Sequence, residues 1–104
     1  MRPSRKGVSQ STVPPALIPT LRLVGTSVPD LSGDYIQTGT SEGKPYYQRS
    51  GTTEYIFWNP ASTSWHIFSV LDSSSSFFLY NYSGSPEGTY YPGIASGSQT
   101  ATFL

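Results

Sequence analysis

The sequence has no cysteine and a single histidine among its 104 residues. The absence of cysteine excludes disulfide bonds, thiolate metal sites and a cysteine nucleophile. Small extracellular domains often depend on disulfide bonds, so their absence favours synthesis in a reducing cytosol. A chain of this length builds one domain with a single modest core.

Long apolar runs are also missing. No stretch approaches the roughly 20 residues of a transmembrane helix, so no membrane partner is expected. The opening MRPSRKGVSQSTVPP is basic, but no apolar stretch follows it, so it does not have the pattern of a signal peptide. No segment shows a 3.6-residue apolar period of useful length, which disfavours helices.

Charged residues make up only 12% of the chain, and they are unevenly distributed. Residues 1–29 hold four basic residues and no acid, whereas residues 30–104 hold two basic and six acidic residues. The sequence therefore predicts a basic arm ahead of an acidic body. Three dispersed charges near the start would attract nucleic acid only weakly, so nucleic acid is not an expected partner.

Residues 1–19 are expected to form an extended arm, separate from a single β domain over residues 20–104. Pro3, Pro14, Pro15 and Pro19 exclude a stable helix. Ordering about fifteen residues costs roughly 15–30 kcal/mol, and the few apolar side chains of the arm return at most about 10 kcal/mol. We therefore expect the arm to become ordered only against other molecules. Its candidate partner-binding residues are Arg2, Arg5, Lys6, Val13, Leu17 and Ile18.

From Thr20 onward, short runs rich in β-branched and aromatic residues alternate with turn signals about every ten residues. We expect seven or eight strands, in the runs 20–24, 34–38, 44–50, 51–58, 64–71, 76–82, 89–93 and 98–104. Pro45 fits the edge or the first residue of its strand. The pattern predicts an all-β domain, a small antiparallel β-sandwich or a partly open barrel.

Two segments share one rhythm of glycine and tyrosine. LSGDYIQTGTSEGK contains Gly33-x-Tyr35, and PEGTYYPGIASGSQ contains Gly88-x-Tyr90. Glycines supply turn geometry, and we expect each tyrosine to pack its ring while its hydroxyl stays in water. The likeness is open to two interpretations, repeated hairpin chemistry or an ancient duplication.

Aromatic residues are abundant, at 14% of the chain. The runs EYIFW and SWHIFSV are apolar on both faces, so we expect Phe57, Trp58, Trp65 and Phe68 in a core covered on two sides. The pairs Tyr46/Tyr47 and Tyr90/Tyr91 must each direct one ring outward. Tyr46 and Tyr90 are our candidates for those exposed, partner-binding rings, because tyrosine is common at binding hot spots.

No enzymatic constellation is evident. His66 lies in mid-strand beside Trp65 with no second histidine, so a structural role is expected. The acidic residues lie near turns and form no pair suited to glycoside hydrolysis; a calcium site at Asp30 and Asp34 is only weakly indicated. There is no nucleophile elbow and no phosphate loop. We expect no catalytic activity, no metal and no cofactor.

The spacing of the glycine, proline and aromatic residues also follows a recognisable pattern. The pattern is G-x-x-x-P-x-x-x-G-x-Y, then G-K-P-x-Y, an aromatic YIxW strand, W-x-I, and a closing G-T-Y-x-P-G with G-x-x-T. The matching positions are Gly25, Pro29, Gly33, Tyr35, Gly43, Lys44, Pro45, Tyr47, Tyr55–Trp58, Trp65, Ile67, Gly88–Tyr90, Pro92, Gly93, Gly97 and Thr100. From Leu21 to Phe103 the chain resembles a β module of uncharacterised tailed-bacteriophage and aquatic bacterial proteins. The resemblance implies a virion component and no catalytic residues.

The leading expectation is a non-enzymatic virion protein of a tailed bacteriophage, a head decoration, neck, tail or fibre component, made in the host cytoplasm. Its partners would be other virion proteins, bound through the arm and the β body in a homo- or hetero-oligomeric assembly. The alternative is a carbohydrate-binding or adhesion module. In that case a surface glycan would stack on Tyr46, Tyr90 and an exposed tryptophan.

Overall fold

The structure is a computed structural model that describes residues 18–71 and 77–104. Within this part of the chain there are eight strands and no helix, as predicted for an all-β domain. The strands are β1 (Thr20–Gly25), β2 (Gly33–Ser41), β3 (Lys44–Arg49), β4 (Tyr55–Asn59), β5 (Ser64–Phe68), β6 (Leu79–Asn81), β7 (Gly88–Pro92) and β8 (Gln99–Phe103). None of the described residues belongs to a helix long and apolar enough to cross a membrane.

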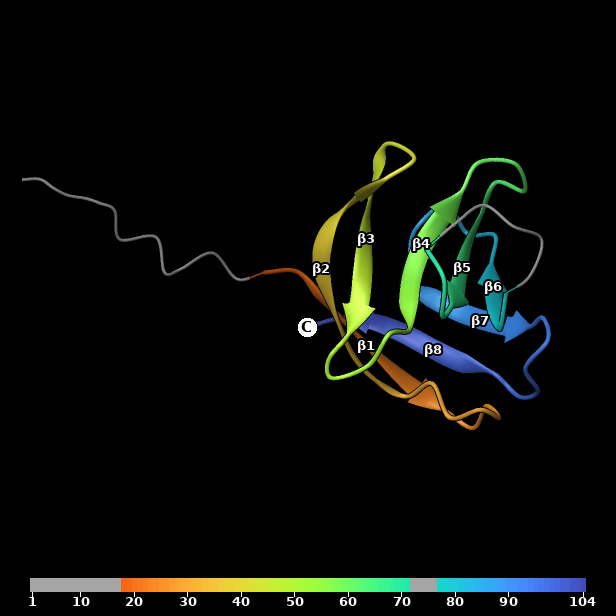
Figure 1. Cartoon of the computed structure of the whole chain (residues 1–104). Helices are drawn as coiled ribbons and strands as arrows, with labels where there is room; N and C mark the ends of the chain where they lie inside the picture. Colours follow the sequence, from red (N-terminus) through yellow and green to blue (C-terminus); the bar gives the residue numbers. More distant parts are fainter. Residues whose placement is uncertain (1–17, 72–76) are drawn as a thin grey trace, which may run out of the picture.

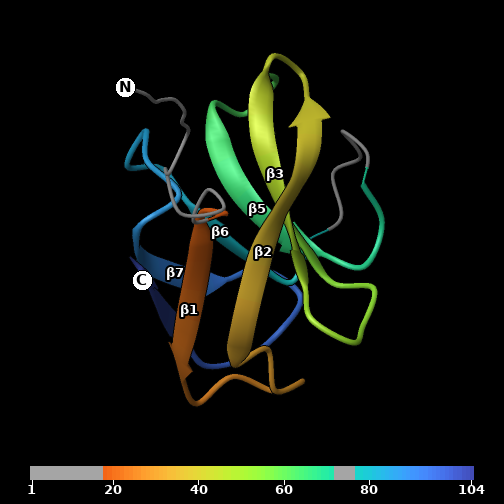
Figure 2. The ribbon, with the colours of Figure 1, turned by 90° about the vertical axis from the view of Figure 1, so that its left-hand side faces the viewer.

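The eight strands form a closed barrel in sequence order (Figures 1 and 2). Each strand runs antiparallel to the next, and β1 also pairs with β8 from Leu21↔Phe103 to Gly25↔Gln99. Of the two predicted architectures the barrel is therefore the one observed, and it is closed rather than partly open. Closure gives every strand a neighbour on each side over at least part of its length, which removes most of the free sheet edge of a sandwich.

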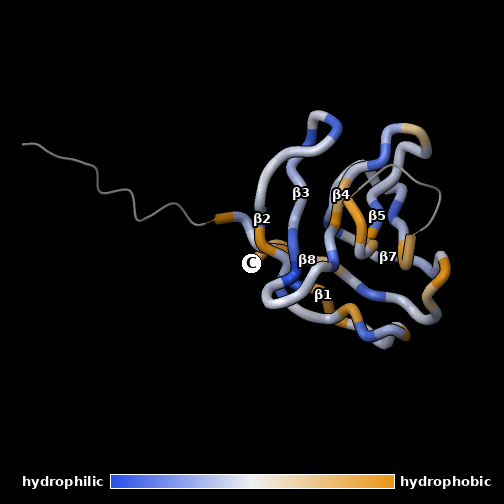
Figure 3. The backbone as a smooth tube through the Cα atoms, in the orientation of Figure 1, coloured by the Kyte–Doolittle hydropathy of each residue, from blue (hydrophilic) through white to orange (hydrophobic). Residues whose placement is uncertain are grey.

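The barrel interior is filled by alternate side chains of the strands. Leu21 and Leu23 of β1 point inward, and Arg22 between them lies on the surface. The core contains Leu21, Leu23, Leu31, Tyr35, Tyr47, Ile56, Trp65, Ile67, Leu79, Tyr90, Ala95 and Ala101. An eight-stranded barrel is just wide enough for side chains to fill. Apolar stretches accordingly appear as short segments interrupted by hydrophilic ones along the tube in Figure 3.

Two buried tyrosines, one in each half of the chain, make the same kind of hydrogen bond. The Tyr35 hydroxyl donates to the carbonyl oxygen of Leu31 at 2.8 Å, and the Tyr90 hydroxyl donates to that of Pro86 at 2.7 Å. Both tyrosines are 0% exposed, and their burial raises the pKa of both hydroxyls. The expectation of solvated hydroxyls was wrong at these positions, because a carbonyl four residues upstream replaces water as the acceptor.

The β2–β3 hairpin extends beyond the ring of paired strands (Figures 1 and 2). β3 pairs with β4 only at Tyr47↔Ile56 and Gln48↔Tyr55, so the first half of β3 has β2 as its single neighbour. Pro45 lies in this half-free stretch, which confirms the predicted edge position. Proline has no N–H to donate, and a stretch that is paired on one side only tolerates such a residue.

Strands β4 and β5 bury both of their faces, as expected. Phe57 and Trp65 are 2% and 3% exposed, and Trp58 and Phe68 are partly buried. The strands are shorter than predicted. β4 begins at Tyr55 because residues 49–54 form a turn, in which the N–H of Arg49 donates to the carbonyl oxygen of Glu54.

Candidate binding surface

The predicted partner-binding residues divide into two groups. Arg2, Arg5, Lys6, Val13 and Leu17 lie outside the described residues. Ile18 is 59% exposed at the point where the chain enters the barrel. The next residue, Pro19, already belongs to the barrel, because its carbonyl oxygen accepts the N–H of Gln37 at 3.0 Å.

The two tyrosine pairs differ in which ring is buried, the second tyrosine in one pair and the first in the other. Tyr47 points into the core, and Tyr46 points the other way, as expected. The ring of Tyr46 is half-buried, because it packs edge-on against Tyr55 with ring centroids 6.0 Å apart. In the second pair the expectation was wrong: Tyr90 is the buried ring and Tyr91 is 52% exposed. Tyr90 faces inward because it pairs with Gln99 of β8, two positions along the strand from the buried pair that contains Ala101.

An outer row of rings crosses four strands. Phe57, His66, Tyr80 and Tyr91 are successive cross-strand partners on β4, β5, β6 and β7. Exposure rises along this row, from 2% at Phe57 and 1% at His66 to 52% at Tyr91. The buried end is covered by Phe77, whose ring stacks on the imidazole of His66 with centroids 4.1 Å apart.

Tyr80 and Tyr91 at the exposed end of the row form an aromatic ledge together with Phe77 and Tyr82, which both pack against Tyr80. Tyr80 lies at its centre, with ring centroids 5.7 Å from Phe77, 5.0 Å from Tyr82 and 6.1 Å from Tyr91. Tyr82 is 66% exposed. The ledge therefore presents two open tyrosine rings that are held in place by a half-buried third. Exposed rings supported in this way lose little side-chain entropy when a partner binds.

His66 belongs to the support of the ledge. Its imidazole is 1% exposed, and burial lowers the pKa of the ring to about 4. Its Nε2 atom lies 2.9 Å from Ser64 Oγ and 3.3 Å from Ser62 Oγ. On the other side, Nδ1 lies 3.5 Å from the side-chain nitrogen of Asn59.

This serine–histidine–asparagine group lacks the proton arrangement of a catalytic triad. The N–H of Ala61 donates to Asn59 Oδ1 at 2.9 Å, which turns the amide nitrogen of Asn59 toward His66. Nδ1 accepts from this amide only in the tautomer that carries the proton on Nε2, and in that tautomer Nε2 donates to Ser64. An imidazole that already holds this proton cannot remove one from the serine. The contacts fix the β4–β5 hairpin, and the structural role expected of His66 agrees with them.

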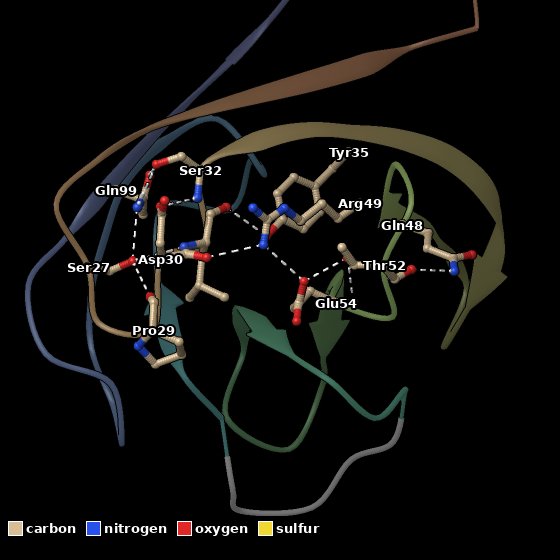
Figure 4. A network of polar contacts seen from close by, with 11 residues as sticks. Ser27, Pro29, Asp30, Ser32, Tyr35, Gln48, Arg49, Thr52, Glu54 and Gln99 are labelled. Atoms are coloured by element: carbon tan, nitrogen blue, oxygen red, sulfur yellow. Dashed lines mark hydrogen bonds and ion pairs between the residues drawn. The ribbon is translucent and has the colours of Figure 1, made fainter.

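A polar network fastens the connector between β1 and β2 (Figure 4). Gln99 donates to Ser27 Oγ at 2.9 Å, and Ser27 donates to the carbonyl oxygen of Pro29 at 2.8 Å. Arg49 donates to the carbonyl oxygen of Asp30 and to Glu54 Oε1, each at 3.1 Å. These bonds close one end of the barrel and leave its polar groups paired.

Two ion pairs, Arg22–Asp34 and Arg49–Glu54, engage four of the charged side chains among the described residues. Arg22 holds Asp34 through two bonds of 2.8 and 3.1 Å, and this pairing lowers the pKa of the Asp34 carboxyl. Asp30 accepts the N–H of Ser32, which lowers the pKa of its own carboxyl. No three metal-ligating side chains converge within residues 18–71 and 77–104. Asp30 and Asp34 thus have protein partners where a calcium ion was considered.

Sequence reasoning identified the tyrosine pairs but missed Phe77, Tyr80 and Tyr82. The signal was present, because Tyr80 and Tyr82 alternate with Leu79 and Asn81, which are both buried.

Compared with known proteins, the chain matches no family model, no curated protein and no solved structure.

Proposed function

We propose that this protein is a non-enzymatic building block of a larger protein assembly, and that the assembly is the particle of a tailed bacteriophage. The virion setting comes from the sequence resemblance. The building-block role is supported by the aromatic ledge, because Tyr82 and Tyr91 are large, rigidly backed rings left 66% and 52% exposed. Tyrosine is among the residues that dominate protein–protein hot spots.

The barrel suits such a role mechanically. Its interior is filled by the core, so partners must bind on its outer surface. The closed barrel holds the ledge on β6 and β7, and Ile18, the residue that follows the basic arm in the sequence, lies beside β2 on the other side (Figure 1). A body with a binding surface and an extension that reaches a neighbour can bind two partners at once, and repetition multiplies weak contacts.

The test is the presence of the chain in purified particles. We expect mass spectrometry to find it at a fixed ratio to a major head or tail protein. A chain without residues 1–17 should fold but be lost from the particles, and the deletion must stop there because Pro19 is bonded to Gln37. Detection of the chain in the lysate only, never in particles, would refute the virion assignment.

Glycan binding is the second candidate function, and the two exposed rings of the ledge are the observation that favours it. The tryptophans cannot serve as open platforms, since Trp65 is 3% exposed and Trp58 is half-buried with Lys44 Nζ 5.2 Å from its ring centroid. Stacking on a sugar would therefore use Tyr82 and Tyr91 in place of Tyr90. Binding on a glycan array that is lost in Tyr91→Ala and kept in Tyr46→Ala supports this function.

A further inference from the structure

The aromatic ledge has the chemistry of a surface that binds a proline-rich strand. Polyproline II segments dock on aromatic side chains, which pack against the pyrrolidine rings. Their carbonyl groups make no internal hydrogen bonds and so accept from neighbouring hydroxyls. Tyr82 and Tyr91 offer ring faces and hydroxyls together, and no ion pair of the described barrel involves the ledge.

A suitable strand is encoded in the same chain. The sequence STVPPALIP, residues 11–19, contains Pro14 and Pro15 side by side, flanked by Val13 and Ala16. Paired prolines favour the polyproline II conformation, which lowers the entropy lost on binding. The run Val13–Ala16 ends two residues before Ile18, where the described chain begins at the barrel.

The arm cannot bring these prolines to the ledge of its own barrel. Pro14 precedes Ile18 by four residues, and an extended chain covers about 14 Å in that length. Ile18 lies beside β2, whereas the ledge lies on β6 and β7, which occupy the opposite side of the ring (Figure 1). The two shorter dimensions of the molecule are 27 and 23 Å. Prolines that bind the ledge must therefore come from another copy.

We propose that Val13–Ala16 of one copy binds the aromatic ledge of a second copy, with the prolines packed between the rings of Tyr82 and Tyr91. This inference rests on the proposed building-block function and names its partner. The contact joins two different surfaces, so each copy can give one arm and receive another. Such head-to-tail contacts produce rings when the rotation closes and filaments when it does not.

A complementation experiment with full-length chains tests this contact. The ledge variant is Tyr82→Ala/Tyr91→Ala, the arm variant is Pro14→Ala/Pro15→Ala, and Tyr46→Ala is the control on a different face. In sedimentation velocity, wild type and control should self-associate with rising concentration. Each double variant alone should associate at least about tenfold more weakly, because hot-spot rings dominate such contacts. An equimolar mixture of the two double variants should give a dimer, since one intact arm meets one intact ledge.

Three different results would contradict the inference. Wild type that stays monomeric to about 1 mM, a mixture that yields no dimer, or a ledge variant that associates like wild type would each overturn the inference. If the ledge variant loses stability in urea, the single variants Tyr82→Ser and Tyr91→Ser take its place. A synthetic peptide of residues 8–19 added to the arm variant should also shift the ring resonances of Tyr82 and Tyr91, whereas the peptide with both prolines replaced by alanine should not.

The inference and the proposed function can fail separately. If mixing yields no dimer but removal of residues 1–17 still excludes the chain from particles, the arm binds a different protein and the building-block function stands. If the ledge variant self-associates normally but loses glycan binding, the ledge is a sugar-binding surface, and the inference is wrong.

Discussion

Two adjacent tyrosines on β7 have opposite roles, which a pair of matched substitutions should separate. Tyr90→Phe removes a buried hydroxyl and leaves the carbonyl oxygen of Pro86 without its 2.7 Å donor, so we expect a loss of about 1–3 kcal/mol in the free energy of unfolding. Tyr91→Phe, at a 52% exposed position, should change it by less than about 0.5 kcal/mol. Urea unfolding of both variants measures the difference. Equal losses would contradict the assignment of Tyr90 to the core.

The buried imidazole of His66 predicts a loss of stability in mild acid. Its pKa is about 4 in the folded chain and about 6.5 when unfolded, because burial penalises the charged ring. The unfolded state therefore binds the proton first as the pH falls. Stability is fully present above about pH 6.5 and declines toward pH 4, by about 2 kcal/mol at pH 4.5.

The matched control for this pH dependence is His66→Gln, which keeps a polar side chain but does not titrate. The free energy of unfolding of wild type minus that of the variant, measured from pH 7.5 to 4.5, isolates the histidine from the carboxylates. We expect this difference to fall as the pH is lowered. A difference independent of pH would show that His66 is protonated equally in both states.

At the scale of single residues, the sequence shows that one ring of each tyrosine pair must point inward, but it does not show which one. Paired tyrosines require one ring on each face, and that much was predictable for Tyr46/Tyr47 and Tyr90/Tyr91. Which ring turns inward depends on the register with a neighbouring strand, Gln37↔Tyr47 in one case and Tyr90↔Gln99 in the other. Register is a relation between distant segments, so the pair alone does not contain it.

Two glycines should respond differently to alanine because they belong to different kinds of junction. Gly43 has φ +79° in the β2–β3 turn, and a Cβ there would meet nothing within 4 Å, so Gly43→Ala should cost about 1 kcal/mol through backbone strain alone. A Cβ on Gly25 would lie 2.2 Å from the carbonyl oxygen of Ser98. Gly25→Ala must separate β1 from β8 and should cost several times more. Thermal unfolding of both variants measures these costs, and similar values would contradict the close approach at Gly25.

Strand positions follow largely from the sequence, and their ends follow less well. Alternation along Thr20–Val24 and the proline at position 45 located β1 and the half-free end of β3 correctly. The start of β4 was placed four residues too early, at residue 51. The turn at residues 49–54 is held by Arg49, which also reaches the carbonyl oxygen of Asp30, and such a distant contact leaves no local signal.

For the molecule as a whole, the two chain ends should differ in their importance for folding. Removal of residues 1–17 should leave the midpoint of thermal unfolding within about 2 °C of wild type, because the described barrel begins at Ile18. Removal of residues 99–104 deletes β8, which leaves β1 and β7 each without a neighbour. This second chain should show no cooperative transition by circular dichroism. A cooperative transition there would mean that the barrel is stable while open.

The all-β class was predictable from alternation, turn signals and the missing helical period, but closure of the sheet was not. Closure depends on Leu21 and Phe103 meeting across the β1–β8 seam, and each of these segments resembles an ordinary strand by itself. The aromatic ledge was not predictable from the sequence for the same reason. It forms only when β6 and β7 place Tyr80 beside Tyr91, although the two residues are separated by a turn-rich connector.

The pairing of β1 with β8 also limits how early the barrel can close during synthesis. Strands β1 to β7 can pair in order as they leave the ribosome, but the second edge of β1 waits for β8, the last of the eight strands in the sequence. Until Phe103 emerges, the nascent chain carries two unsatisfied strand edges, which are the features that chaperones and premature oligomers recognise. Completion of the barrel thus has to wait until β8 has been synthesised, and a closed barrel that can dock another copy exists only after that step.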